Sequence, residues 1–245
     1  MFSRSYSANP ENPDEKLSFF RVTMDPLSDE KVVDSWRKNA APWTSAVRER
    51  QIESRRVTDG AIVDAVLSVH PRRVLDVGCG EGWLARALHA HGVEVTGVDV
   101  VAELIDRARQ AGGGDFRVLS YEALAAGALR DRFDAVVANF ALIGAQTVDA
   151  LVRSVPTLLT HGGSLIIQTL HPIVSCGDEQ YADGWRHGSW AGFNPDFTDP
   201  APWYFRTMES WERLIAGAGL SMIERREPLN PASGKPASVI FIARS

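Results

Sequence analysis

A glycine-rich segment, VLDVGCGEGW at residues 74–83, constrains this chain more than any other part of its sequence. An apolar run over residues 73–77 leads into three glycines at alternate positions, Gly78, Gly80 and Gly82, and a helical pattern of leucines and alanines follows. The order strand, glycine loop, helix lets a nucleotide-like ligand approach the backbone at the carboxyl end of a strand. The segment therefore predicts a ligand-binding βαβ unit.

An acidic residue beside this loop restricts which ligands can bind there. The spacing is Gly-x-Gly-x-Gly, not the Gly-x-Gly-x-x-Gly of dinucleotide folds, and Asp76 stands two residues before the first glycine. In a dinucleotide fold the loop holds a pyrophosphate on the positive end of a helix, and a carboxylate at Asp76 would repel that group. The same carboxylate suits a ligand that carries an ammonium and a sulfonium group.

A second acid, Asp99, ends a short β-rich run over residues 93–99, 17 residues after Gly82. An acid at this position of a nucleotide-binding βαβ unit can accept hydrogen bonds from both ribose hydroxyls. The sequence therefore predicts a ribose site beside the glycine loop.

Together, Asp76, the three glycines and Asp99 resemble the first motif of the class I S-adenosylmethionine (SAM)-dependent methyltransferases, Asp/Glu-x-Gly-x-Gly-x-Gly. The resemblance covers about residues 55–170 and extends more loosely to the end. It points to the small-molecule branch that includes the ubiquinone and menaquinone biosynthesis methyltransferases. It implies SAM as cofactor, S-adenosylhomocysteine (SAH) as product, and a doubly wound, Rossmann-like sheet of seven mostly parallel strands under an N-terminal helical cap.

The resemblance also implies cofactor contacts at the ends of the following strands. Ser120 stands where many relatives carry an Asp for the adenine amine, so Tyr121, Glu122 or the backbone is left to serve the adenine. Asn139 ends the fourth strand without the two prolines of the amine methyltransferase motif, and it is either a cofactor contact or ordinary strand-end polarity. The expected cofactor-binding set is Asp76, Gly78, Cys79, Gly80, Gly82, Trp83, Asp99, Val100, Ser120, Tyr121, Glu122, Asn139 and Phe140.

Candidates for the acceptor side come from one histidine and several aromatic residues. His171 directly follows the fifth expected strand, where a histidine could act as a general base or could merely order the turn at Pro172. Trp36 and Trp43 have the spacing of core residues, but the resemblance places them on the cap. In an extended segment alternate side chains point to opposite faces, so part of residues 203–206 can form a wall for a planar acceptor. The expected substrate-binding set is Trp36, Trp43, His171, Trp203, Tyr204 and Arg206, with His171 as the catalytic residue.

The chain divides into a flexible tail over residues 1–27, a helical cap over 28–56 that opens at the N-cap signal of Ser28, and a methyltransferase domain over 57–245. Helices are expected at 43–52, after a break at Ala41-Pro42, and at 61–69. Residues 171–206 form a long irregular stretch rich in aromatic side chains, which we interpret as a substrate-side insert.

Apolar runs alternate with helical patterns through the main domain, and this alternation favours a parallel α/β sheet. The expected strands lie at residues 73–77, 93–99, 116–120, 133–139, 164–169, 221–227 and 238–243.

Composition excludes several other classes of protein. The 245 residues carry a net charge of −5 without a basic stripe, which argues against a nucleic-acid substrate. No apolar run reaches the length of a membrane span, and the first residues lack a signal pattern, so we expect a cytoplasmic protein. Its two cysteines form neither a disulfide framework nor a zinc motif, and no metal is expected. The assembly expected is a monomer or a homodimer.

The leading hypothesis is a SAM-dependent methyltransferase acting on a small planar or aromatic metabolite, with O-methylation favoured over N- or C-methylation because His171 is available as a base. Two alternatives remain open. The departure at Ser120 allows a non-catalytic SAM-binding protein. An NAD(P)-dependent oxidoreductase is opposed by Asp76 and by the spacing of the glycines.

Overall fold

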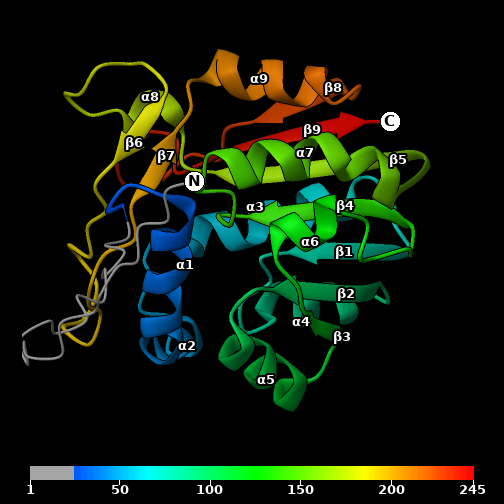
Figure 1. Cartoon of the computed structure of the whole chain (residues 1–245), viewed down its shortest axis with the longest axis horizontal. Coiled ribbons are helices and arrows are strands. Elements are labelled where there is room, and N and C mark those ends of the chain that lie inside the picture. Colours follow the sequence, from blue (N-terminus) through cyan, green and yellow to red (C-terminus); the bar gives the residue numbers. More distant parts are fainter. Residues whose placement is uncertain (1–24) are drawn as a thin grey trace, which may run out of the picture.

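The structure, a computed structural model, describes residues 25–245 of the chain (Figure 1). The tail expected over residues 1–27 therefore lies almost wholly outside the described range. No helix within residues 25–245 combines the length and the apolar character needed to cross a membrane.

A seven-stranded sheet forms the centre of the domain, as the sequence predicts. Its strands are β1 (Arg73–Val77), β2 (Glu94–Asp99), β3 (Asp115–Val118), β4 (Phe133–Asn139), β5 (Leu159–Thr169), β8 (Ser221–Arg226) and β9 (Val239–Arg244). They follow the order β3-β2-β1-β4-β5-β9-β8, with the first five parallel. β9 pairs antiparallel with both β5 and β8, so the last strand alone opposes the rest.

The strand order fixes where a ligand can bind. From β1 the chain winds outward through β2 to β3 and then returns to place β4 on the other side of β1. In such open sheets the crevice beyond the carboxyl ends of the strands, at the point where the order reverses, is the usual ligand site. The glycine loop follows β1 directly and therefore lies at this crevice.

Helices cover both faces of the sheet (Figure 1). One core is shared with α6 (Tyr121–Ala125), α7 (Gln146–Leu158) and α9 (Met208–Gly217). The other is shared with α3 (Arg55–Leu67), α4 (Trp83–His89) and α5 (Ala102–Ala111).

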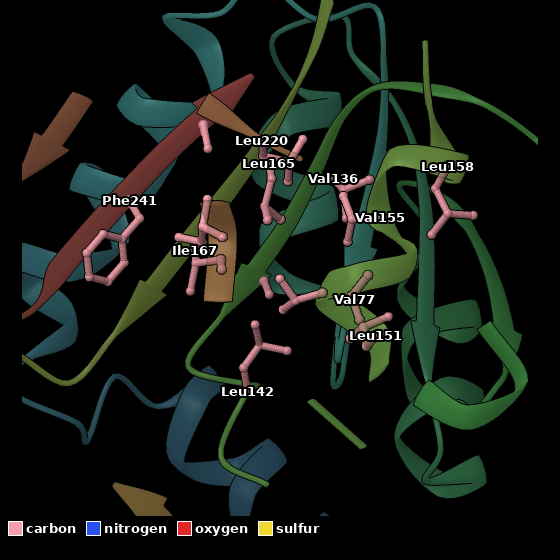
Figure 2. Packing of buried hydrophobic residues seen from close by; sticks show 14 of the residues in the cluster. Val77, Val136, Leu142, Leu151, Val155, Leu158, Leu165, Ile167, Leu220 and Phe241 are labelled. Carbon is pink, nitrogen blue, oxygen red and sulfur yellow. The ribbon is translucent and has the colours of Figure 1, made fainter. Parts of the chain in front are cut away.

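Successive side chains of a strand point to opposite faces of the sheet and so enter different cores. In β5, Leu165 and Ile167 enter the first core while Ile166 enters the second. Figure 2 shows the first core, where Ile167 lies beside Phe241 of β9. Because both faces are buried, the central strands read in the sequence as continuous apolar runs, and this is why they could be predicted.

The N-terminal helices are α1 (Asp29–Lys38) and α2 (Ala40–Arg48). The side chain of Ser28 accepts a hydrogen bond from the N–H of Lys31, so the expected start of α1 is confirmed. The break expected at Ala41-Pro42 is wrong, because Pro42 falls in the first turn of α2, where its missing N–H has no helical partner to lose. The helix expected at 61–69 begins earlier, at Arg55, and runs through the exposed Gly60.

The insert over residues 171–206 is not wholly irregular. It contains α8 (Pro172–Ser175) and a separate two-stranded antiparallel sheet of β6 (Gly184–Arg186) and β7 (Trp203–Phe205). Figure 1 shows α1 and this hairpin at the same end of the molecule, beyond the carboxyl ends of β1 and β4.

Candidate functional site

A cavity of about 900 Å³ opens at the carboxyl ends of the central parallel strands. The glycine loop and the strand ends form its floor, and α1, α2 and part of the insert form its roof. Most of the residues predicted for cofactor and substrate line it together, namely Trp36, Trp43, Gly78, Cys79, Gly80, Trp83, Asp99, Val100, Ser120, Tyr121, Glu122, Asn139 and Phe140.

The three loop glycines all have left-handed backbone conformations, with φ of +71° at Gly78, +56° at Gly80 and +82° at Gly82, but they serve different ends. A Cβ on Gly78 would collide with Ala141, and one on Gly82 would lie 2.9 Å from the ring of Phe116. A Cβ on Gly80 would meet only the indole nitrogen of Trp43, at 3.6 Å. Gly78 and Gly82 are therefore required by packing, whereas Gly80 keeps the backbone open toward the cavity.

Asp99 joins the loop to the end of β2. One carboxylate oxygen accepts a hydrogen bond from the N–H of Gly80 at 3.0 Å, and the other accepts one from the N–H of Val101 at 2.8 Å. Burial raises the pKa of Asp99, and these backbone hydrogen bonds oppose the rise. The carboxylate is thus held in place at the cavity wall, with acceptor capacity left over.

Asp76 lies beneath the glycine loop rather than in the cavity wall. It is 2% exposed, and its Oδ2 has no hydrogen-bond partner among residues 25–245. Burial, reinforced by the charge of Asp99, raises the pKa of Asp76 to about 7. A buried carboxylate without a partner is costly, so this position calls for a donor or a cation.

The end of β3 leads into α6. The hydroxyl of Ser120 caps α6 by accepting a hydrogen bond from the N–H of Ala123. Tyr121 donates its hydroxyl hydrogen to the carbonyl of Ala141 at 3.0 Å, and burial raises the pKa of this phenol. Glu122 is exposed at the cavity edge. The side chains of Ser120 and Tyr121 therefore both make structural contacts, and Glu122 keeps a carboxylate free of hydrogen bonds to other described residues.

The end of β4 presents a second unsatisfied group. Asn139 lines the cavity, and its Oδ1 is buried without a hydrogen-bond partner in the described part of the chain. The next residue, Phe140, has a left-handed backbone with φ of +51°, and its N–H donates to the carbonyl of Gln168 at 2.8 Å. Such a conformation is strained for a bulky residue, and here it occurs at a residue that lines the cavity.

The roof of the cavity is an aromatic wall. Trp36 of α1 packs edge to face against Trp43 at 5.1 Å between ring centroids and against Trp190 at 5.9 Å. Trp190 in turn contacts Phe193 at 5.3 Å, and all four rings line the cavity. Trp190 and Phe193 were missed as site residues, although the concentration of aromatic side chains in the insert was the signal that could have identified them.

The aromatic wall is fixed to the insert by polar contacts. The side chain of Asn39 accepts from the N–H of Thr198 at 2.9 Å and donates to its carbonyl at 2.7 Å. Lys31 and Lys38 of α1 both reach the carboxylate of Asp199. The helical cap and residues 190–199 of the insert are therefore joined into one cover.

The guanidinium group of Arg55 lies at the cavity beside Trp83, which directly follows the glycine loop. Arg55, in the first turn of α3, lies 4.4 Å from the ring of Trp83 and forms an ion pair with Asp59. Thr58 is buried beside them, and its hydroxyl has no partner among residues 25–245. All four residues line the cavity, which gives this wall a cation and a hydroxyl donor.

Four predicted substrate residues do not reach the cavity: His171, Trp203, Tyr204 and Arg206. His171 is 6% exposed and lies 3.6 Å from Glu227, because the chain turns into α8 after β5 and leaves Thr169 and Leu170 at the cavity instead. His171 therefore lies outside the cavity, and its role as a general base stays a prediction.

Residues 203–206 do alternate between two faces, but neither face is a wall of the cavity. Trp203 packs with Phe205, whereas the guanidinium of Arg206 lies 4.8 Å from the ring of Tyr204. Arg206 is 4% exposed and donates to the carbonyls of Gly144 and Ala145. Its role is to brace the loop between β4 and α7.

Comparisons with known proteins agree with this geometry. A family model described as a methyltransferase domain matches residues 42–225. A ubiquinone biosynthesis O-methyltransferase of Xanthomonas oryzae pv. oryzae is 39% identical over 114 residues, which are 44% of this chain and 47% of that protein. A protein of the same name from Xanthomonas campestris pv. campestris is 38% identical over the same shares. The match thus spans about half the length of these curated relatives.

Solved structures share the fold. A SAM-dependent methyltransferase from Mesorhizobium loti superposes with a TM-score of 0.58 at 22% identity, covering 76% of this chain and 96% of that one. The 1,6-didemethyltoxoflavin-N1-methyltransferase of Burkholderia thailandensis, solved with bound 1,6-didemethyltoxoflavin and SAH, gives a TM-score of 0.61 at 17% identity over 87% and 89% of the two chains. At these identities the likeness concerns the architecture alone.

Proposed function

The chain belongs to the methyltransferase-domain family, and we propose that it transfers the methyl group of SAM to a planar small molecule held under its helical cap. The observation that carries the proposal is the pairing of Gly80 with Asp99 at the cavity wall. Gly80 leaves the backbone accessible, and Asp99 presents an ordered carboxylate beside it. A nucleoside needs this combination, because its ribose can bond to the acid while its chain lies along the loop.

The polar groups around the loop fit the remaining parts of SAM. At the cavity wall, Oδ1 of Asn139 lacks a donor among the described residues, and the methionine ammonium group can supply one. The positive charge of the same group would also favour the ionised form of Asp76, which is buried beneath the loop. Arg55 and the hydroxyl of Thr58 suit the methionine carboxylate. For the adenine amine, Glu122 is the accessible carboxylate after β3, in place of the missing aspartate at Ser120.

The acceptor compartment lies at the roof side of the same cavity. Trp36, Trp190 and Phe193 offer ring faces and edges, and Ile143 and Leu170 add aliphatic surface. Aromatic walls of this kind favour flat, largely apolar ligands with few polar groups. O-methylation remains the favoured reaction because the curated relatives are named O-methyltransferases, although N-methylation of a heterocycle fits the same walls.

We expect catalysis in this cavity to depend mainly on positioning. Within residues 25–245 the cavity is lined by no histidine or lysine, and its candidate proton acceptors are carboxylates such as Glu30 and Asp34 of α1. Bound SAM supplies an activated methyl group, so the chain has to align the acceptor and exclude water. Alignment of two reactants contributes as much as about 7–11 kcal/mol to lowering a barrier. An acceptor hydroxyl or ring nitrogen that ionises near neutral pH then needs no further proton acceptor from the protein.

Calorimetry with SAH tests the cofactor assignment. We expect binding to the wild-type protein and its loss in Asp99→Ala, because each hydrogen bond to a charged group contributes about 1.5–3 kcal/mol. Gly80→Val should abolish binding by placing a branched side chain in the cavity. Wild-type affinity in either variant, with the fold intact by circular dichroism, would refute the assignment, and a response to NADH instead of SAH would favour an oxidoreductase.

Methyl transfer itself requires a product. Incubation with SAM labelled at the methyl group and a panel of phenols and nitrogen heterocycles should yield a labelled small molecule. SAH binding without any labelled product from the panel or from cell extract would favour a non-catalytic SAM-binding protein instead.

A further inference from the structure

Asp29, the first residue of α1, reaches across to the amino end of α7. Its Oδ1 accepts a hydrogen bond from the N–H of Ala145 at 2.6 Å, and its Oδ2 accepts one from the N–H of Thr147 at 2.9 Å. Gly144 lies so close that a Cβ there would collide with Oδ1 of Asp29. These contacts link the helical cap to the main domain over more than one hundred residues of sequence.

The contact provides α7 with a side-chain acceptor at its amino end, which its own N-cap residue lacks. The first N–H groups of any helix have no partner within the helix, and a side-chain oxygen at the N-cap normally accepts from one of them. The N-cap of α7 is Ala145, which has no such oxygen. The carboxylate of Asp29 takes that role from another element, and its negative charge suits the positive end of the helix dipole.

The same loop forms a wall of the acceptor compartment. Ile143, Gly144 and Thr147 line the cavity. On the other side of the loop, Arg206 holds the carbonyls of Gly144 and Ala145. The loop therefore has hydrogen bonds to Arg206 of the main domain and to Asp29 of the helical cap.

We propose that Asp29 is a latch, a positioning residue that couples closure of the helical cap to formation of the acceptor wall at residues 143–147. The proposal rests on the function proposed above. With α1 in place, both N–H groups of the loop are satisfied and the wall is rigid. When α1 lifts, these groups lose their partner, and the wall is held only by contacts within the main domain, from Arg206 to Gly144 and Ala145 and from the N–H of Tyr204 to the carbonyl of Ile143. Acceptor entry and product release then accompany unlatching, and methyl transfer requires the latched state.

Amide exchange measured by NMR on the full chain without ligand tests the latch directly. In Asp29→Ala, we expect the amides of Ala145 and Thr147 to exchange at least tenfold faster than in the wild type. Asp29→Asn should fall between the two, because its amide group retains one acceptor oxygen. Asp34→Asn is the matched control, since Asp34 lies on the same helix but bonds to Lys31 and Lys38 instead of α7, and it should leave both amides protected.

Gly144→Ala should disrupt the same contact through a change in the loop rather than in α1. Its new Cβ would displace the carboxylate of Asp29, so exchange at Ala145 and Thr147 should accelerate as in Asp29→Ala. The comparison uses the amide of Ala145, because the new Cβ would also lie 3.0 Å from Oγ1 of Thr147 and could disturb that residue directly. At Ala145, the double variant should exchange no faster than Asp29→Ala alone, because the two changes remove one interaction. Additive effects at Ala145 would mean that Gly144 acts independently of Asp29 and would overturn the latch.

Kinetics separate the latch from a general loss of structure. Once an acceptor is known, Asp29→Ala should lower kcat/KM for the acceptor at least tenfold while the Kd for SAH changes by less than about threefold. Unchanged amide exchange in Asp29→Ala and Asp29→Asn would refute the latch. If the wild type failed to bind SAH, the proposed function would fail instead, and the exchange rates would still decide whether Asp29 holds the loop.

Discussion

The carboxylate of Asp99 accepts a hydrogen bond from the backbone N–H of Gly80 at 3.0 Å, so the acid after β2 and the glycine loop after β1 form one unit. A carboxylate has about four acceptor positions, and the N–H groups of Gly80 and Val101 occupy two of them. The other two remain for the hydroxyls of a ribose. Loss of this carboxylate should therefore loosen the loop as well as remove ligand contacts.

The glycines of the loop should separate stability from binding. Gly80→Ala and Gly82→Ala both place a side chain on a left-handed backbone, which costs roughly 1–2 kcal/mol. Only Gly82→Ala also overpacks the core, against Phe116 at 2.9 Å and Ala108 at 3.1 Å, which adds about 1–3 kcal/mol. We expect Gly82→Ala to give the larger fall in Tm by calorimetry and Gly80→Ala the larger loss of SAH affinity. Equal falls in Tm would contradict this division of roles.

Asp76 should make stability depend on pH. Its pKa is raised to about 7 in the folded protein, against about 3.9 in an unfolded chain, so the folded state holds the extra proton between these values. The free energy of unfolding should therefore fall as pH rises from about 4 to about 7, by on the order of 4 kcal/mol. Asp99, whose pKa is also raised, contributes in the same direction. Urea unfolding at several pH values measures the slope, and the wild type should show a steeper fall than Asp76→Asn.

The affinity for SAH should depend on pH in the opposite direction to the free energy of unfolding. If the ammonium of SAH lies near Asp76, it favours the ionised carboxylate, so SAH affinity of the wild type should rise with pH between about 5 and 8. Asp76→Asn should bind SAH with an affinity that changes little over the same range. A flat profile in the wild type would argue that the ammonium is held elsewhere, with Asn139 as the remaining candidate.

Much of the fold could be predicted because its signals are local. Strand β4 was placed correctly at Phe133–Asn139, since a strand buried on both faces is an apolar run whatever its neighbours are. The starts of α2 and α3 were misplaced because Pro42 and Gly60 act as helix breakers only in some contexts. Pro42 occupies a first turn, and Gly60 faces open space, so neither disrupts its helix.

The candidate site was predictable only in part, because only some of its residues belong to local sequence patterns. The loop glycines and Asp99 follow directly from a strand–loop–helix pattern. Asp29, Trp190 and Phe193 reach the cavity only through packing between segments far apart in the sequence, and no local pattern identifies such contacts. The expected role of His171 depended on where a side chain points after a strand ends, which the turn into α8 decides.

His171→Ala should change stability more than turnover. The imidazole is buried, and neither ring nitrogen has a hydrogen-bond partner among residues 25–245. Truncation should therefore lower Tm by a few degrees through lost packing, as a loss of about 1 kcal/mol does in a domain of this size. We expect kcat for methyl transfer to stay within about threefold. A fall of a hundredfold or more at unchanged SAH affinity would restore His171 as the base.

Trp190 should determine acceptor binding, and Trp185 provides its matched control. Both are tryptophans of the insert, but Trp190 lines the cavity and packs against Trp36, whereas Trp185 packs against Tyr204 away from it. An aromatic pair contributes about 0.5–1.5 kcal/mol beyond the area it buries, so loss of the ring should weaken both the roof and its contact with a planar acceptor. We expect Trp190→Ala to lower kcat/KM for the acceptor about 10- to 100-fold, with the Kd for SAH within threefold. Trp185→Ala should leave kcat/KM nearly unchanged, and equal losses in the two variants would show that the insert acts through its fold rather than through the wall it presents.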